Sequence, residues 1–420
     1  MIISSGKKIT VGILFGGKSA EHEVSLQSAK NVYDAIDRSK FEPVLIGIDK
    51  NGKWLLSDAS RFLLNDGDPR HISLNPSGES VALIPASAGL LSTPPPPKNS
   101  TRTGERVVEQ MQHGVGQVNA AVTNKSEGPP SPPPEKRTRT GERVDEQMRH
   151  GVGQVKAAIT AESEGPHLDV VFPILHGPFG EDGTVQGLLK LAGVPFVGSG
   201  VLSSAIGMDK DVMKRLFRDA GMPIGKFLTF MSHNTLPPFA EITAALGSPV
   251  FVKPANMGSS VGISKVCNET EFSAAVDAAF QHDTKIIIEE FIPCREIECA
   301  VLGNEKPIAS IPGEVIPTHE FYSYEAKYLD ENGAALEIPA KLDDETRRRV
   351  QELSIKAFQT LCAEGLARID FFLKEDGEVL INEINTMPGF TKNSMYPKLW
   401  EASGIGYTEL ITRLIELAMG

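Results

Sequence analysis

The sequence predicts a protein of mixed α/β and α+β class that opens with a parallel sheet. Two early apolar runs, residues 9–15 and Phe41–Ile48, flank a predicted helix, as in a βαβ unit. Near the C-terminus, residues 368–373 and Val379–Asn385 flank an Asp-Gly pair, which is typical of an antiparallel hairpin. The chain has 420 residues, of which 40% are hydrophobic, so we expect two or three domains.

The overall charge and the cysteines exclude several classes of protein. Lys and Arg number 42 against 54 Asp and Glu, and this net charge of -12 argues against nucleic acid as the partner. Cys267, Cys294, Cys299 and Cys362 show no CxxC spacing, so we expect reduced thiols in a cytoplasmic protein. The apolar run at 9–15 is too short to span a membrane, so we expect no membrane association.

The first strand, residues 9–15, ends at two glycines, and a helix follows. Ser19 is the predicted N-cap, with Glu21 and Glu23 in the first turn. Ligands of open parallel sheets bind beyond the carboxyl ends of the strands, so Glu23 is a candidate for binding an ammonium group. The alternative is a carboxylate that only interacts with the helix dipole.

A segment of different composition, residues 93–166, interrupts the first domain. Proline runs bracket it, and residues 101–129 match residues 138–166 at an offset of 37. Two copies with few large apolar residues bury little surface, so we expect a duplicated, mostly disordered insertion. A partner-binding arm is the alternative.

The globular pattern resumes with a buried strand at residues 168–175. A glycine-rich loop, residues 176–183, then leads from His176 to a helix at Thr184–Ala192. A loop between strand and helix is a ligand-facing position, although a loop histidine with satisfied hydrogen bonds is the simpler reading. We expect the first domain to end near residue 200.

The middle of the chain carries two lysines beside a flexible loop. Lys210 opens a helix, and Lys253 lies on a short strand that is followed by a Gly- and Ser-rich loop at 256–262. Such a loop can wrap phosphate oxygens while the lysine neutralises them, although the spacing is not that of a P-loop. The strand Lys285–Glu290 then enters a link, residues 291–293, whose backbone groups can read an adenine edge.

The C-terminal third contains further predicted elements. Residues 296–302 and 306–312 are expected to pair as strands, and an amphipathic helix is expected at 343–362. Between them, residues 318–330 are aromatic and polar without periodicity, as in loops that act as lids. A closing helix is predicted at Tyr407–Met419.

The hairpin places charged residues opposite one another. A turn centred on the Asp-Gly pair sets Asp370 opposite Glu383 and Arg368 opposite Asn385. Like charges directly across a strand pair are destabilising, so a cation is expected between the two acids. Hard oxygen ligands favour magnesium that carries nucleotide phosphates. A surface hairpin with solvated acids is the alternative.

Taken together, these motifs resemble the D-alanine:D-alanine ligases of the ATP-grasp superfamily. The resemblance covers nearly all of the chain outside the insertion and is carried by residues 21–25, 176–183, 208–210, 252–254, 258–262, 324–328, 368–370, 383–385 and 387–391. It implies an N-terminal open parallel α/β domain at 1–200 followed by a two-domain ATP-grasp fold, with subdomains at 201–292 and 293–420.

The resemblance also implies an activity. One D-alanine is activated by ATP as an acylphosphate, and a second D-alanine displaces phosphate, giving D-alanyl-D-alanine for peptidoglycan. Two Mg²⁺ ions, with Mn²⁺ as a substitute, are implied at Asp370, Glu383 and Asn385. A cytoplasmic homodimer is expected.

For the nucleotide, the resemblance implies that Lys210 and Lys253 neutralise phosphate oxygens. It assigns the adenine pocket to Glu289, Glu290 and Ile292. The remaining nucleotide contacts that it implies are Ser260, Glu296 and Lys327. Position 290 is glutamate where many relatives carry lysine.

For the first substrate, the resemblance implies that Glu23 holds the ammonium group in a network with Ser259 and Tyr328. Relatives that make D-alanyl-D-lactate commonly lack tyrosine at this place, so Tyr328 favours an amine as the second substrate. The alternatives are a related ligase that uses D-lactate or another second substrate, and a binding protein without catalytic activity.

For the reacting centre, Arg368 and the backbone amide of Gly389 are implied to stabilise the oxyanion. Ser394 and Met395 are implied to receive the carboxylate of the second substrate, and His176 to line the substrate site. Many relatives carry leucine where this chain has Met395.

Overall fold

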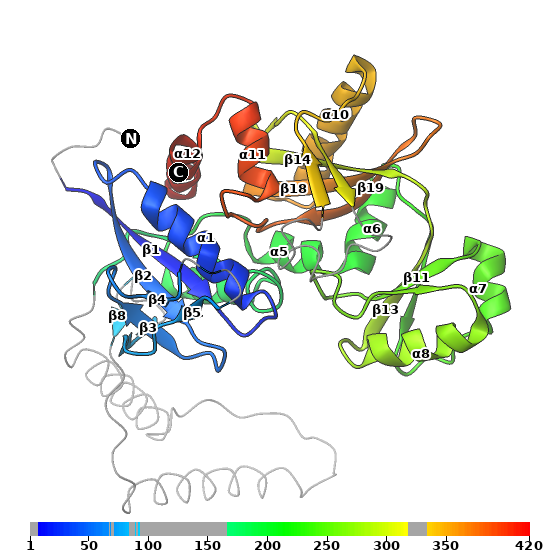
Figure 1. Ribbon diagram of the computed structural model, residues 1–420, viewed down its shortest axis with the longest axis horizontal. Helices are drawn as coiled ribbons and strands as arrows, with labels where there is room; N and C mark the ends of the chain where they lie inside the picture. Colours follow the sequence, from blue (N-terminus) through cyan, green and yellow to red (C-terminus); the bar gives the residue numbers. More distant parts are fainter. Residues whose placement is uncertain are drawn as a thin grey trace, which may run out of the picture. The chain divides into compact units, whose positions relative to one another are not determined.

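The computed structural model describes residues 7–66, 68, 71–83, 89, 91–92, 166–317 and 334–420. Apart from Ser92, these residues belong to one compact unit, which joins the chain up to Leu91 with the chain from Gly165 onward (Figure 1). The predicted insertion, except Pro166, lies outside the described residues. The same holds for the predicted lid, with Lys327 and Tyr328.

The first sheet has the strand order β6-β3-β2-β1-β9. Its strands are β1 (Ile9–Gly16), β2 (Phe41–Ile48), β3 (Trp54–Ser57), β6 (Glu79–Ser80) and β9 (Val170–Ile174). The parallel pairing of β1 with β2 and β9 confirms the predicted open parallel sheet. The antiparallel strands β3 and β6 at one edge were not predicted, because such short runs carry little periodic signal.

Helices cover this sheet, and short strands follow it. Helix α1 (His22–Ala35) contacts β1, and α4 (Thr184–Ala192) follows the glycine-rich loop as predicted. The short strands are β4 (Leu63–Leu64), β5 (Ser73–Leu74), β7 (Ala82–Leu83) and β8 (Leu91–Ser92). The prediction that Ser19 caps α1 is wrong: the helix begins at His22, and the Ser19 hydroxyl donates to the carbonyl of His176 at 2.7 Å.

The second sheet is antiparallel, in the order β10-β13-β11-β12. Its strands are β10 (Phe227–Met231), β11 (Val250–Pro254), β12 (Ser264–Val266) and β13 (Lys285–Glu290). One face, with Ile286 and Ile288, packs against α7 (Phe239–Leu246) and α8 (Glu269–Phe280). Because side chains alternate along a strand, Lys285 and Glu289 point to the other face, where α6 (Lys210–Asp219) lies after α5 (Val201–Met208).

The third sheet has the order β17-β16-β14-β18-β19, and β15 pairs with β14. Its strands are β14 (Arg295–Gly303), β15 (Ile308–Ala309), β16 (Gly313–Pro317), β17 (Ala334–Glu337), β18 (Gly365–Leu373) and β19 (Val379–Asn385). Helix α10 (Asp344–Thr360) buries Leu353 and Phe358 against Ile369 and Phe371. Helices α11 (Met395–Ala402) and α12 (Tyr407–Met419) pack in another core, which includes Leu302 and Leu366.

The predicted hairpin is present, but its turn differs from the expected one. Near the turn, Leu373 pairs with Val379 and Phe371 with Ile381, so the turn is centred on Asp376 rather than on the Asp-Gly bond. A β-bulge beyond Phe371 then shifts the register by one residue. The predicted pairs Asp370 with Glu383 and Arg368 with Asn385 are therefore confirmed, although the simple turn that predicted them is wrong.

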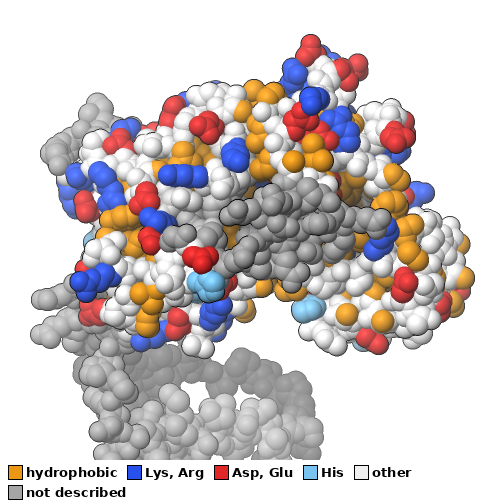
Figure 2. Space-filling model, in the orientation of Figure 1, with side chains coloured by type: hydrophobic (Ala, Val, Ile, Leu, Met, Phe, Trp, Pro, Cys, Tyr) orange, Lys and Arg blue, Asp and Glu red, His pale blue; other side chains and the backbone are white. Residues whose placement is uncertain are grey.

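The surface carries both kinds of charge. On the face shown in Figure 2, acidic and basic side chains of the described residues are interspersed. In the part of the chain that the structure describes, no helix is long and apolar enough to cross a membrane.

Candidate functional site

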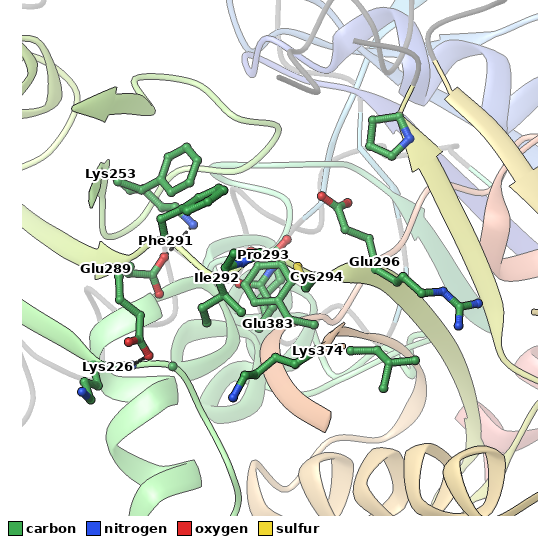
Figure 3. A pocket seen from close by; sticks show the side chains of 18 of the residues that line it. Lys226, Lys253, Glu289, Phe291, Ile292, Pro293, Cys294, Glu296, Lys374 and Glu383 are labelled. Carbon is green, nitrogen blue, oxygen red and sulfur yellow. Dashed lines mark hydrogen bonds and ion pairs between the residues drawn. The ribbon is translucent and has the colours of Figure 1, made fainter. Parts of the chain in front are cut away.

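A cavity of about 850 Å³ brings together most of the residues predicted to bind nucleotide (Figure 3). The second sheet, the link after β13 and the hairpin of the third sheet all contribute to its wall. The predicted residues that line it are Lys210, Lys253, Ser259, Ser260, Glu289, Glu290, Ile292, Glu296 and Glu383.

Glu289 is buried between two lysines. One carboxylate oxygen lies 2.7 Å from the ammonium of Lys214 on α6, and the other lies 2.5 Å from the ammonium of Lys253 on β11. Burial opposes the charge of Glu289, but the two lysines outweigh it and hold its pKa far below the usual value. Burial would lower the pKa of Lys253, but Glu289 raises it. Glu289 therefore favours the charged form of Lys253 and holds the ammonium groups of both lysines in place.

The link after β13 forms a mixed apolar and polar wall. The Glu290 carboxylate accepts from the backbone N–H of Lys226 at 2.7 Å, so its side chain closes the link rather than projecting freely. The Phe291 ring is 39% exposed and lies beneath the ammonium of Lys265, 4.9 Å from the ring centre. Burial, reinforced by Glu296, raises the pKa of Cys294 to about 12, so this thiol stays neutral.

Lys210 connects the Gly- and Ser-rich loop to the hairpin. Its buried ammonium donates to the carbonyl of Met257 at 2.6 Å and lies 4.0 Å from Glu383. Burial lowers its pKa, and Glu383 acts in the opposite direction. Ser259 and Ser260, in the same loop, have φ values of 51° and 61°, which cost a non-glycine residue about 1–3 kcal/mol each.

The two acids of the hairpin are balanced by side chains of the protein itself. Arg368 donates to both carboxylate oxygens of Asp370 at 2.7 Å and lies 2.9 Å from Glu298. Asn385 also donates to Asp370, at 2.9 Å. The repulsion argument alone therefore does not require a metal, because Arg368 and Lys210 supply positive charge beside the acids.

The donor set of the hairpin nevertheless suits magnesium. Asp370, Glu383 and Asn385 share one face of the paired strands and offer carboxylate and amide oxygens, the ligands that Mg²⁺ prefers. No group of three or more His, Cys, Asp or Glu side chains that could hold a metal occurs among the described residues. The predicted ligands are two acids and one amide, and they do not form such a group because asparagine is not one of these four residue types.

The acid to which the Ser259 hydroxyl donates is Glu21, whereas the prediction gave this place to Glu23. The Ser259 hydroxyl donates to Glu21 at 2.5 Å, and the Glu21 side chain is buried. Glu23 instead forms an ion pair with Lys50 at 2.6 Å, and its side chain is 31% exposed. Because α1 begins at His22, Glu21 lies before the helix on the site side, and Glu23 turns with the helix toward solvent.

His176 and Glu181 lie on the same glycine-rich loop. Burial lowers the pKa of His176, so the ring is neutral, and its Nδ1 lies 3.0 Å from the carbonyl of Met387. Since a carbonyl only accepts, Nδ1 carries the proton and Nε2 is an acceptor. Among the described residues this buried Nε2 has no partner. Burial and the nearby Glu21 raise the pKa of Glu181 well above its usual value.

The predicted carboxylate-binding pair lies at the start of α11. The Ser394 hydroxyl accepts from the backbone N–H of Thr391 at 3.0 Å. Met395 is 5% exposed, and its side chain packs in the hydrophobic core. Its backbone N–H, in the first turn of the helix, is the group that can face an anion. Gly389 lies beside Ser394, since a Cβ there would come within 3.1 Å of its hydroxyl.

Two family models together match most of the chain. The model described as D-ala D-ala ligase N-terminus matches residues 10–199, and the one described as D-ala D-ala ligase C-terminus matches residues 216–416. The chain belongs to the D-alanine–D-alanine ligase family. It is 48% identical over 413 residues to a D-alanine–D-alanine ligase of Oceanobacillus iheyensis, covering 98% of this chain and 95% of that one.

Other relatives of the D-alanine–D-alanine ligase family agree in sequence and in fold. The chain is 48% identical over 416 residues to D-alanine–D-alanine ligase A of Escherichia coli K12, covering 98% of this chain and 96% of that one. The ligase structure from Coxiella burnetii superposes with a TM-score of 0.73 at 31% identity, covering 99% and 94%. The VanG D-Ala:D-Ser ligase of Enterococcus faecalis superposes with a TM-score of 0.72 at 30% identity, covering 98% of this chain and 100% of that one. The predicted ATP-grasp fold is thereby confirmed.

Sequence reasoning missed several site residues of this ligase family member. Lys214 follows Lys210 by one helical turn, and this i, i+4 spacing was a usable signal. Glu181, within the quoted loop motif, and Glu298, two residues beyond Glu296 on the same strand face, were also available from spacing. The role of Glu21 needed the start of α1, which the motif alone does not give.

The buried carboxylate of Glu289 leads to a prediction about pH. Replacement by glutamine leaves Lys214 and Lys253 facing each other, so we expect the free energy of unfolding to fall by about 3–5 kcal/mol at pH 7. The pKa of Glu289 is lowered in the folded state, so its contribution is complete above the ordinary value of 4.5 and is lost as the pH falls below it. Urea unfolding should show the gap between wild type and variant shrinking below pH 4.5.

A matched control for that prediction is Glu305→Gln, because Glu305 is exposed and lies in a loop. It should change the free energy of unfolding by less than about 0.5 kcal/mol at either pH. A gap for Glu289→Gln that is equally large at pH 7 and pH 3.5 would contradict the ion-pair assignment.

Proposed function

We propose that this protein joins two molecules of D-alanine into D-alanyl-D-alanine, with conversion of ATP to ADP and phosphate, for peptidoglycan synthesis. The observation that carries the proposal is 48% identity, over nearly the whole chain, to proteins named for this reaction. The arrangement of lysines, Gly- and Ser-rich loop and hairpin acids around one cavity supports it. We also propose a homodimer in the cytoplasm, as the family resemblance suggests.

The nucleotide phosphates are proposed to bind between Lys210 and Lys253. Both ammonium groups reach the cavity and are held by partners within the protein, Met257 and Glu289. Positive groups fixed before the ligand arrives need little rearrangement when negative charge develops. The adenine is proposed to lie against the link after β13, beside Ile292, and Glu296 is proposed to bind the ribose.

Two magnesium ions, or manganese in their place, are proposed at Asp370, Glu383 and Asn385. Bound there, a divalent ion would neutralise negative charge on the phosphates during transfer. Arg368 now directs two donors at Asp370, so we expect it to change partners when substrates bind. Its guanidinium and the Gly389 amide would then bind the oxyanion of the tetrahedral intermediate, which forms when the amine of the second D-alanine attacks the acylphosphate of the first and which collapses with loss of phosphate.

The substrate amines are proposed to bind at the glycine-rich loop. Glu21, held by Ser259, offers a carboxylate for the ammonium of the first D-alanine. The Nε2 lone pair of His176 is an acceptor for an N–H group, because Nδ1 already donates to Met387. Ser394 and the first N–H groups of α11 are proposed to bind the carboxylate of the second D-alanine. Tyr328 keeps its proposed place in the Ser259 network, and Lys327 its contact to nucleotide.

An assay of D-alanine-dependent ADP release tests the proposed function directly. With ATP, Mg²⁺ and D-alanine, the protein should release ADP and form D-alanyl-D-alanine, identified by mass spectrometry. Parallel reactions with D-lactate or D-serine as the second substrate should give little mixed product. A predominant mixed product would show a related ligase, and no ADP release with any of these substrates would show a binding protein.

Separate replacement of Glu21 and Glu23 by glutamine tests the proposal that Glu21 binds the substrate ammonium. Glu21→Gln removes the charge that would bind an ammonium, so kcat/KM for D-alanine should fall by about 100-fold or more, which is a loss of roughly 3 kcal/mol. Glu23→Gln is the matched control and should change kcat/KM by less than about threefold, because the partner of Glu23 among the described residues is the exposed Lys50. The reverse ranking in steady-state kinetics would restore Glu23 to the site.

Substitution of Glu383 tests the metal assignment. Glu383→Gln removes one carboxylate ligand, so Mn²⁺ binding in the presence of ADP, followed by electron paramagnetic resonance, should weaken by about 10–100-fold. The rate of ligation should fall by at least the same factor. Glu409→Gln, at an exposed position of α12, serves as the control for both measurements. Wild-type Mn²⁺ affinity in Glu383→Gln would refute this ligand.

A further inference from the structure

Lys285, the first residue of β13, is not among the residues that line the cavity. Its side chain is 14% exposed, and its ammonium lies 2.7 and 2.5 Å from the two carboxylate oxygens of Asp209. The same ammonium lies 3.3 Å from Asp211. A cation with so little exposure to solvent is tolerated because two acids balance it. Both acids lie at the start of α6, so Lys285 joins the strand to the beginning of that helix.

The start of α6 is itself tightly bonded. The Asp209 carboxylate caps the helix by accepting from the backbone N–H of Val212 at 3.1 Å. Asp211 accepts from the Thr229 hydroxyl at 3.0 Å and from Arg215 at 2.7 Å. Acidic side chains at a helix N-terminus also interact favourably with the helix dipole. These bonds fix where the helix begins relative to the second sheet.

Strand β13 carries a positive charge followed by a negative one, and helix α6 carries negative charges followed by a positive one, so opposite charges meet along the two elements. Lys285 and Glu289 point to the same face of β13, because side chains alternate along a strand. Lys285 pairs with the acids at the start of α6, and Glu289 pairs with Lys214 one turn further along the helix. A slip of the helix along the strand would bring like charges together. The paired charges therefore specify one register between helix and strand.

This register determines where Lys210 points. The backbone N–H of Lys210 donates to the carbonyl of Ala255 at 3.0 Å, and its ammonium donates to the carbonyl of Met257 at 2.6 Å. The backbone N–H of Ala255 in turn donates to the carbonyl of Lys285 at 2.9 Å. The side chain of Lys285 thus holds the helix that carries Lys210, and its main chain holds the loop against which Lys210 rests.

We propose that Lys285 is a positioning residue for the phosphates of the nucleotide. It balances Asp209 and Asp211, fixes the start of α6 and thereby aims Lys210 into the cavity. Without the ammonium of Lys285, the start of α6 would lose its ion pairs to β13, and the Lys210 ammonium would lose its alignment with the phosphates. The inference rests on the proposed ATP-dependent ligation, but binding of ADP tests it without any ligation.

Lys285→Met tests the proposal, since methionine keeps the length of the side chain and removes its charge. We expect the Kd for ADP with Mg²⁺, measured by calorimetry, and the KM for ATP to rise about tenfold, because a displaced phosphate lysine loses its alignment. The kcat and the KM for D-alanine should change by less than about twofold. Lys285→Arg should restore ADP affinity, because arginine keeps the charge and can bind both oxygens of Asp209.

Arg215→Met is the matched control. It removes a cation from Asp211 but leaves the pair between Lys285 and Asp209, so ADP affinity should stay at the wild-type value. If Lys285→Met does not fold, Asp209→Asn carries the test, because asparagine still caps the helix but has no charge. It should weaken ADP binding by a similar factor.

The outcomes separate this inference from the proposed function. Wild-type ADP affinity in the charge-removing variant, with only a lower unfolding temperature, would show a structural role and overturn the inference. Tight ADP binding by the wild type without D-alanine-dependent ADP release would instead overturn the proposed ligase activity and leave the inference standing.

Discussion

The buried ion pairs of Glu289 are the interaction on which the nucleotide site depends. One carboxylate holds Lys214 of α6 and Lys253 of β11, so a single residue joins a helix to two strands. Compared with apolar residues of similar volume, a buried ion pair adds little net stability, but removal of one partner leaves the other charge unbalanced and is costly. The cavity can therefore present fixed positive charge to phosphate, while the apolar face of the same sheet packs against α7 and α8.

The strands and helices that carry the site were largely predictable, because their periodicity and boundaries are local. Thr184–Ala192, Lys285–Glu290 and Tyr407–Met419 have the predicted bounds. The hairpin shows the limit of local reasoning. The pairs of Asp370 with Glu383 and of Arg368 with Asn385 were predicted correctly only because a β-bulge compensates for a turn whose centre differs from the predicted one. A bulge arises from packing on both faces of a sheet, which a sequence pattern does not encode.

The candidate site was predicted as a set of residues more successfully than as a set of contacts. The resemblance placed Lys210, Lys253 and Glu383 around one cavity, but it could not tell Glu21 from Glu23. That choice depends on where α1 begins and on Ser259, which is 238 residues away in the chain. Contacts across such distances are set by the assembled fold. The contact of Arg368 with Asp370 is different, because the two residues are two positions apart on one face of β18 and their pairing was available from strand alternation.

A crystal structure with ADP, Mg²⁺ and D-alanine is the most direct test of the central claim, that the lysines ordered by Glu289 and the hairpin acids form one phosphate and metal site. The account predicts phosphate oxygens within hydrogen-bond distance of the Lys210 and Lys253 ammonium groups. It also predicts metal bound to Asp370 and Glu383. Nucleotide bound elsewhere, or phosphates that touch neither lysine, would contradict it.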